Sequence, residues 1–146
     1  MIDLTQQEAD ALLTLKKYYF ETDILQFPDL GGTLRLVLHS LDKREEFNLD
    51  ITRGKISLAK NTFQTRARKA IVLVRLDILG PPHRNPDGEE VECPHIHLYR
   101  EGFGDKWAYP LPNELKGIGD MYELLDKFMD YCHIIGKPTI ERGLFT

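Results

Sequence analysis

The feature that most limits the fold is a series of short segments in which apolar and polar side chains alternate. The pattern is clearest where Phe47, Leu49 and Ile51 are separated by single polar residues. Successive side chains of a strand point to opposite faces of a sheet, so this alternation predicts strands with one buried face and one polar face. The short, turn-rich connections between these segments favour antiparallel neighbours.

We expect strands at several places in the middle of the chain. They cover residues 34–39, 47–52, 56–58, 70–79 and 91–100, with a last short strand at residues 106–111. The basic residues 60–69 are expected to be irregular. Residues 80–88 are rich in Pro, Gly, Asn and Asp, which predicts a long loop between the two richest strands.

Two amphipathic helices are expected on either side of these strands. Thr5 and Glu8 have the spacing of a capping box, and the helix that follows should fade near Phe20. Apolar residues recur with helical spacing between Ile118 and Cys132. The chain is therefore predicted to be one α+β domain over residues 1–146. We expect a single curved, mostly antiparallel sheet of five to six strands, with both helices packed on one face. The last residues form a tail that is either docked or frayed.

The apolar runs, the N-terminal residues and the cysteine content exclude several classes of protein. No apolar run approaches the ~20 residues that a membrane helix requires, and the N-terminus has no basic start or apolar segment of a secretory signal. Cys93 and Cys132 are the only cysteines and form no CxxC pair, which favours a reducing compartment. We therefore expect a cytoplasmic protein that does not contact a membrane, and a bridge between these two cysteines stays open.

Positive charge is concentrated in residues 53–76. This segment has no Asp or Glu, and its seven cations are Arg53, Lys55, Lys60, Arg66, Arg68, Lys69 and Arg75. Such a segment suits phosphate, nucleic acid or an acidic protein partner. The alternative is a solvated face that acidic side chains from elsewhere neutralise. The sequence does not choose between the two.

Polar side chains that are capable of catalysis or binding gather on one face of the predicted sheet. In the strand at residues 91–100, His95, His97 and Tyr99 share a face. The same rule places Arg75 and Asp77 on the polar side of the preceding strand. Asn48 and Asp50 join them if their strands are neighbours, and His83 and Arg84 could fold over this face from the connecting loop.

This mixture favours acid–base chemistry on a phosphate ester. Two imidazoles can act as base and acid near neutral pH, and arginines can bind phosphate and stabilise developing charge. The predicted function is a ribonuclease or phosphodiesterase that needs no metal and no cofactor, with RNA or another phosphate-bearing molecule as substrate. The candidate catalytic residues are His95, His97, Tyr99, Asp77 and His83. The candidate phosphate- or nucleic-acid-binding residues are Arg75, Arg84, Arg66, Arg68, Lys69, Lys60, Arg53 and Trp107.

Three other interpretations stay open. His95 and His97, with Glu101 or Asp77, have the spacing of a transition-metal site of cupin type, although the later histidine motif of cupins is missing. Cys93 lies on the same face as His95 and could act as a nucleophile. The protein could also be a non-catalytic factor that holds nucleic acid or an acidic partner through the basic segment. For His39 and His133, an ordinary structural role is expected.

Several long motifs resemble a family of small bacterial and prophage proteins known only as a domain of unknown function. The resemblance extends from about residue 40 to 135, and the motifs that carry it are FNLDI at residues 47–51, PHRNPDG at 82–88, CPHIHLY at 93–99 and DKWAYPL at 105–111. The family has no activity to transfer, so the resemblance implies no catalytic residue. Its association with mobile elements implies a toxin or a phage–host conflict protein, with an acidic antitoxin as a partner.

Overall fold

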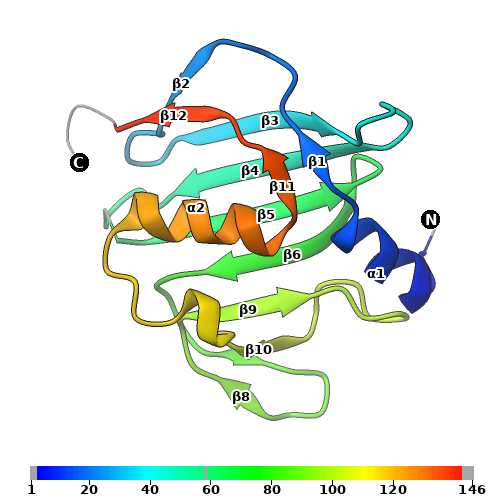
Figure 1. Cartoon of the computed structure of the whole chain (residues 1–146). Helices are drawn as coiled ribbons and strands as arrows, with labels where there is room; N and C mark the ends of the chain where they lie inside the picture. The colour runs from blue at the N-terminus through cyan, green and yellow to red at the C-terminus, as the bar shows by residue number, and fades with distance from the viewer. Residues whose placement is uncertain (1–2, 58, 143–146) are drawn as a thin grey trace.

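A curved eight-stranded sheet runs through the molecule (Figure 1). The computed structural model describes residues 3–57 and 59–142. The strand order is β10-β9-β6-β5-β4-β3-β1-β11, and only the β1–β11 pair is parallel among these neighbours. The strands are β1 (Lys17–Tyr18), β3 (Thr33–His39), β4 (Glu46–Arg53), β5 (Asn61–Ala67), β6 (Ile71–Asp77), β9 (His95–Leu98), β10 (Ala108–Pro110) and β11 (Ile134–Gly136). The predicted α+β class and mostly antiparallel sheet are confirmed, but the sheet has more strands than the five to six expected.

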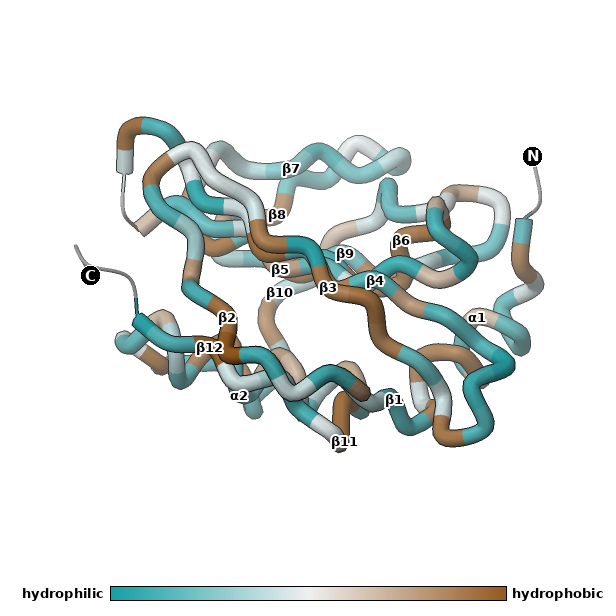
Figure 2. The backbone as a smooth tube through the Cα atoms, turned by 90° about the horizontal axis from the view of Figure 1, so that it is seen from above, coloured by the Kyte–Doolittle hydropathy of each residue, from teal (hydrophilic) through white to brown (hydrophobic). Residues whose placement is uncertain are grey.

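Two short strand pairs lie outside this sheet. β2 (Ile24–Gln26) pairs in parallel with β12 (Thr139–Glu141), so the end of the chain is docked as far as it is described. β7 (His83–Arg84) and β8 (Glu90–Val91) form a small antiparallel hairpin within the predicted long loop. This hairpin lies on the opposite side of the sheet from α2 (Met121–Tyr131), as Figure 2 shows.

The core lies between the sheet and α2. Alternate residues of the central strands point to this side and are fully buried, among them Leu49, Ile51 and Phe63. The ring of Phe128 on α2 lies 5.9 Å from that of Phe63. Asp120 caps the helix by accepting a hydrogen bond from the backbone of Glu123. Because one face of these strands packs in the core, the polar side chains of the same strands lie on the other face.

The N-terminal helix α1 (Gln6–Thr14) is shorter than predicted and is placed differently. Its capping box between Thr5 and Glu8 is present as expected. The helix ends at Thr14, and the chain then enters β1, so the predicted continuation to Phe20 is wrong. α1 lies at an end of the sheet near the loop after β9, where Gln6 exchanges hydrogen bonds with Glu101, rather than across the face as α2 does (Figure 1). A single 3-10 turn, η1 (Asn113–Leu115), precedes α2.

The largest error in the predicted elements concerns the basic segment. Residues 60–69 were expected to be irregular, yet β5 occupies most of them, with alternate residues buried. Of the predicted strand at residues 56–58, Ile56 is exposed in a loop, and Leu58 lies outside the described residues. Cys93 and Cys132 are both free thiols, so the disulfide left open by the sequence is not formed.

No helix in the described part of the chain combines the length and apolar character needed to cross a bilayer.

Candidate functional site

The pairing of β6 with β9 brings the predicted polar residues together. Asp77 is opposite His95, and Arg75 is opposite His97. Residues directly opposite one another in an antiparallel pair project to the same face, so all four side chains share the face that points away from α2. The predicted shared face of these residues is confirmed.

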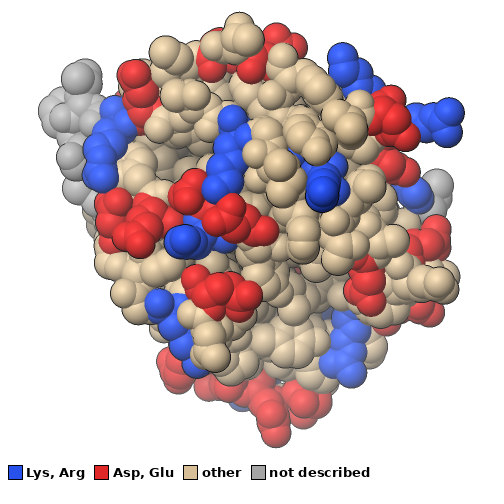
Figure 3. All heavy atoms as spheres, in the orientation of Figure 1, with Lys and Arg blue, Asp and Glu red and all other residues tan. Residues whose placement is uncertain are grey.

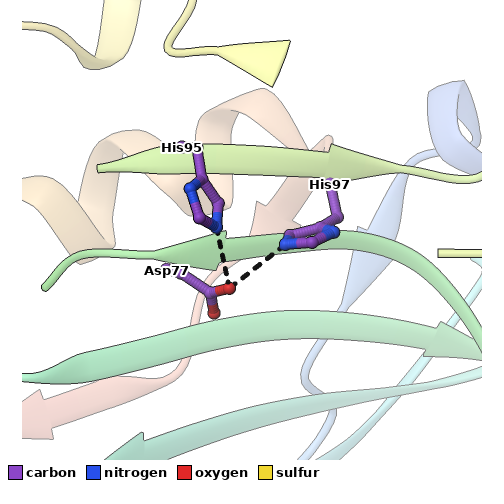
Figure 4. Close-up of side chains that lie close together, drawn as sticks. All are labelled: Asp77, His95 and His97. Atoms are coloured by element: carbon purple, nitrogen blue, oxygen red, sulfur yellow. Dashed lines mark hydrogen bonds and ion pairs between the residues drawn. The ribbon is translucent and has the colours of Figure 1, made fainter. Parts of the chain in front are cut away.

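Both imidazoles point at one oxygen of Asp77 (Figure 4). Asp77 Oδ2 lies 3.2 Å from His95 Nε2 and 3.2 Å from His97 Nε2. The ligand-type atoms of these three residues all lie within 4.8 Å of one another. His95 is 2% exposed and His97 is fully buried, whereas Asp77 is partly exposed. The two histidines are therefore buried, and solvent reaches the cluster from the side of Asp77.

The remaining ring nitrogen of each histidine faces a backbone carbonyl. His95 Nδ1 lies 3.2 Å from the carbonyl oxygen of Glu92, and His97 Nδ1 lies 2.8 Å from that of Asp105. A carbonyl oxygen only accepts hydrogen bonds, so Nδ1 carries the hydrogen in both rings. In the neutral form of either imidazole, the lone pair of Nε2 is then directed at the carboxylate of Asp77.

Arg75 completes the cluster from the other end. Its Nη2 lies 3.1 Å from His97 Nε2, its Nε lies 3.4 Å from Asp77 Oδ1, and its Nη1 lies 3.0 Å from Asp105 Oδ2. A guanidinium only donates hydrogen bonds, so its contact with His97 also places a lone pair on Nε2. The neighbours of His97 Nε2 therefore conflict in the absence of a cation, because Arg75 can only donate to this nitrogen whereas Asp77 Oδ2 can only accept from it.

Asp77 is ionised in this environment. Burial by itself would raise the pKa of its carboxyl group, but three causes outweigh it: the hydrogen bond that His97 donates when its Nε2 is protonated, the charge of Arg75, and the hydrogen bond that His95 donates in the same form. Together they hold the pKa of Asp77 well below its usual range. The cluster therefore contains a permanent carboxylate beside two imidazole nitrogens.

The loop that carries β7 and β8 folds against this cluster. The ring of His83 lies 4.6 Å from that of His97 and 6.1 Å from that of His95, and its Nε2 lies 2.7 Å from the carbonyl oxygen of Lys106. Asn85 fixes the loop through two hydrogen bonds between its side-chain amide and the backbone of Ala108. The prediction that His83 folds over the site agrees with this placement. The neighbouring Arg84 is exposed and pairs with Glu90 instead.

Tyr99 does not join the cluster. β9 ends at Leu98, and the hydroxyl of Tyr99 donates to the carbonyl of Leu4 at 2.7 Å and accepts from its backbone nitrogen at 2.9 Å. The interpretation of Tyr99 as a residue that orients a phosphoryl oxygen is therefore corrected: it anchors the N-terminal segment. Glu101, the other carboxylate considered for a metal, accepts from the backbone of Gln6.

Most arginines of the basic segment are paired with acidic side chains. Arg66 forms a two-point ion pair with Asp50, at 2.6 and 3.0 Å, and Arg68 lies 3.5 Å from Glu45. Figure 3 shows the opposite face of the sheet, the one that carries α2, and there too positive and negative side chains are interspersed. For these arginines, the alternative of neutralisation by acids from elsewhere agrees with the structure better than an open anion-binding strip.

The other predicted binding residues have separate surroundings. Arg53 is buried, donates to the carbonyl of Pro28 at 3.1 Å and covers the ring of Phe27, so its assignment as a phosphate-binding residue is corrected. Lys69 is exposed in the β5–β6 turn. The guanidinium of Arg100 lies 4.1 Å from the ring of Trp107 and covers it, so that ring is not an open stacking platform. Lys60, by contrast, lines a pocket beside His95.

Sequence reasoning missed three residues that hold the cluster in place. Glu92 and Asp105 act through their backbone carbonyls, and Asp105 also binds Arg75 through its carboxylate. Every residue has a backbone carbonyl, so the residue type gives no indication of these roles and they could not be inferred from the sequence. The loop residue Asn85 belongs to a turn-rich motif that was recognised only as a loop.

Comparison with known proteins identifies relatives but no activity. A model described as a family of unknown function, DUF6978, matches residues 4–134. No curated protein and no solved structure is significantly similar to the chain.

Proposed function

We propose, for a chain that belongs to the DUF6978 family of unknown function, that Asp77, His95 and His97 bind one divalent transition-metal ion and that this centre is the active site. The proposal rests on one observation: a carboxylate oxygen and two imidazole nitrogens converge with electron pairs directed at the same point. In the tautomers that the backbone carbonyls favour, none of the three atoms carries a hydrogen to share. A cation between them satisfies all three at once.

Two of the three separations also suit a shared metal ion. Ligand atoms bound at about 2.0–2.2 Å from a metal are about 3.0–3.5 Å apart at octahedral or tetrahedral angles. Asp77 Oδ2 lies 3.2 Å from each of the two Nε2 atoms. The carbonyls behind both rings supply the support that metal-binding histidines usually have, because they fix the tautomer and the ring orientation.

Two histidines and one carboxylate leave coordination positions open. Such a donor set suits Fe²⁺, Zn²⁺, Mn²⁺ or Co²⁺, and the open positions take water or substrate. A metal there acts as a Lewis acid that polarises a bound oxygen. Access from the side of Asp77, where the cluster meets a pocket, is consistent with this use.

A second candidate is the metal-independent acid–base chemistry expected from the sequence. The observation that favours it is Arg75, whose Nη2 lies 3.1 Å from His97 Nε2 and brings a positive charge into the cluster without any metal. In this account His95 and His97 act as acid and base, Asp77 fixes the tautomer of a histidine, and Arg75 binds a phosphate. The burial of His97 counts against this candidate, because a ribonuclease with two catalytic imidazoles needs both of them in contact with the substrate.

Metal titration of untagged protein separates the two candidates. Wild-type protein should bind one Zn²⁺ or Co²⁺ ion per chain in a calorimetric titration, and both His95→Ala and His97→Ala should lose this binding. His39→Ala is the matched control, because His39 lies on the distant strand β3 and should leave binding unchanged. Failure of wild-type protein to bind any of the four metals would exclude the metal centre. Cleavage of RNA in EDTA that depends on His95 would support the second candidate instead.

A further inference from the structure

A small pocket opens directly beside the cluster. Its volume is about 230 Å³, and Asp77 and His95 form part of its wall. Leu79, Pro81 and Pro82 contribute an apolar side. The pocket therefore joins the proposed metal centre to a space where a substrate can lie.

Lys60 gives this pocket its positive charge. Among the described residues that line the pocket it is the only Lys or Arg, and its Cε lies near Gly80 of the loop. The one carboxylate in the wall is Asp77, which the metal would neutralise. With a divalent ion bound, the pocket thus carries a clear positive charge that comes from the ion and from Lys60.

The loop at residues 79–83 forms one anchored wall of this pocket. Proline fixes the backbone of residues 81 and 82, and His83 and Asn85 tie the next part of the loop to Lys106 and Ala108. These contacts fix one wall of the pocket, which is partly open to solvent.

We propose that the substrate is a small anion, whose phosphate or carboxylate group binds between the metal and Lys60 and whose short apolar body lies against Leu79, Pro81 and Pro82. This inference rests on the proposed metal centre. It narrows the substrate class from nucleic acid to a small molecule, because a pocket of about 230 Å³ with one lysine in its wall fits a compact anion, whereas a nucleic-acid chain is held by several cationic side chains.

The test uses Co²⁺-loaded protein, because the visible absorption of Co²⁺ changes when its ligands change. Phosphate, or a short-chain carboxylate in a parallel titration, should alter the spectrum in a saturable way. Lys60→Met should weaken this anion binding several-fold, since one charge-assisted hydrogen bond from an exposed lysine is lost, while the spectrum without anion stays the same. Lys55→Met is the matched control, because Lys55 is exposed on the same segment, as Lys60 is, but does not line the pocket.

The outcomes separate the two proposals. Co²⁺ binding without any response to anions, or an equal response in the Lys60→Met and Lys55→Met variants, overturns the substrate proposal and leaves the metal centre intact. Absence of Co²⁺ binding overturns both. A single-stranded RNA that displaces phosphate from the loaded protein contradicts the small-molecule class, whereas RNA that leaves phosphate bound supports it.

Discussion

At the scale of single residues, Arg75 distinguishes the two accounts of the site. Its guanidinium touches His97 and lies near Asp77, so its charge opposes a metal ion in the same cluster. Arg75→Met should therefore raise the affinity for Zn²⁺ or Co²⁺ several-fold in a calorimetric titration. If Arg75 instead serves a metal-free reaction on phosphate, the variant loses activity and gains no metal affinity. Arg35→Met, on the same polar face but on β3, controls for a general loss of positive charge.

Lys17 is the other residue with an unusual environment. It is fully buried, and its Nζ donates to the carbonyls of Leu13, Leu15 and Cys132, at 2.8–2.9 Å. These carbonyls belong to the C-terminal ends of α1 and α2, so a single ammonium group satisfies the ends of both helices.

Lys17→Met should lower the free energy of unfolding by about 3 kcal/mol or more, because several buried carbonyls lose their donor. Chemical denaturation measures this change. Lys16→Met, the preceding exposed lysine, should change the free energy of unfolding little. Equal stability of the two variants would contradict the role assigned to Lys17.

Which residues meet at the site could largely be predicted, because strand alternation assigns faces without knowledge of the fold. Asp77, Arg75, His95 and His97 were placed on one face by this rule, and the register agrees. The rule failed at Tyr99, where β9 has already ended. It also gives no information about backbone carbonyls, which decide the tautomers of both histidines.

At the scale of elements, the hairpin between β5 and β6 explains why β5 was missed. The buried side of β5 includes Asn61, Thr65 and Ala67, which make a weak apolar signal. The turn that follows has Arg68 at φ 49° and Lys69 at φ 69°, a conformation in which Asn and Gly are expected. Neither the strand nor its turn therefore has the residues by which sequence patterns are recognised.

Replacement of Lys69 with glycine should stabilise this hairpin. Glycine adopts positive φ without the steric penalty of a side chain, so Lys69→Gly should raise the free energy of unfolding by about 0.5–1 kcal/mol. Lys116→Gly is the control, because Lys116 is exposed at φ −82° and should gain nothing from glycine. A loss of stability in Lys69→Gly that equals the loss in Lys116→Gly would contradict the strain assigned to this turn.

The ion pair between β4 and β5 makes stability depend on pH. Burial alone would raise the pKa of Asp50, but hydrogen bonds from Arg66 and Gln64 and the charge of Arg66 lower it. Because the pKa is lower in the folded state, the unfolded chain binds more protons in acid. The stabilisation is complete above the unfolded pKa of about 4 and is lost as the pH falls through the folded value.

Asp50→Asn should therefore reduce the acid dependence of stability. Its free energy of unfolding should be lower than that of wild type near pH 7, and the difference should shrink as the pH falls from about 5 to 3. Urea denaturation at several pH values measures this. Parallel pH profiles for the two proteins would show that the Asp50–Arg66 pair does not contribute in the expected way.

At the scale of the whole molecule, the sheet order could not be read from the sequence. Local alternation gives strands and faces, but the position of β1 and β11 at the far end of the sheet depends on contacts between distant parts of the chain. The division into an apolar face under α2 and a polar face under the β7–β8 loop follows from this order (Figure 2). It isolates the cluster from the core and gives it a pocket of its own.

The central claim is that Asp77, His95 and His97 hold a metal ion, and anomalous diffraction from a crystal soaked in Zn²⁺ or Co²⁺ tests it most directly. The account predicts one anomalous peak per chain, at about 2.0–2.2 Å from Asp77 Oδ2 and from the Nε2 atoms of both histidines. It also predicts that the peak is absent from crystals of the His97→Ala variant. A saturated soak with no peak at this position, with Arg75 still in contact with His97, would contradict the account.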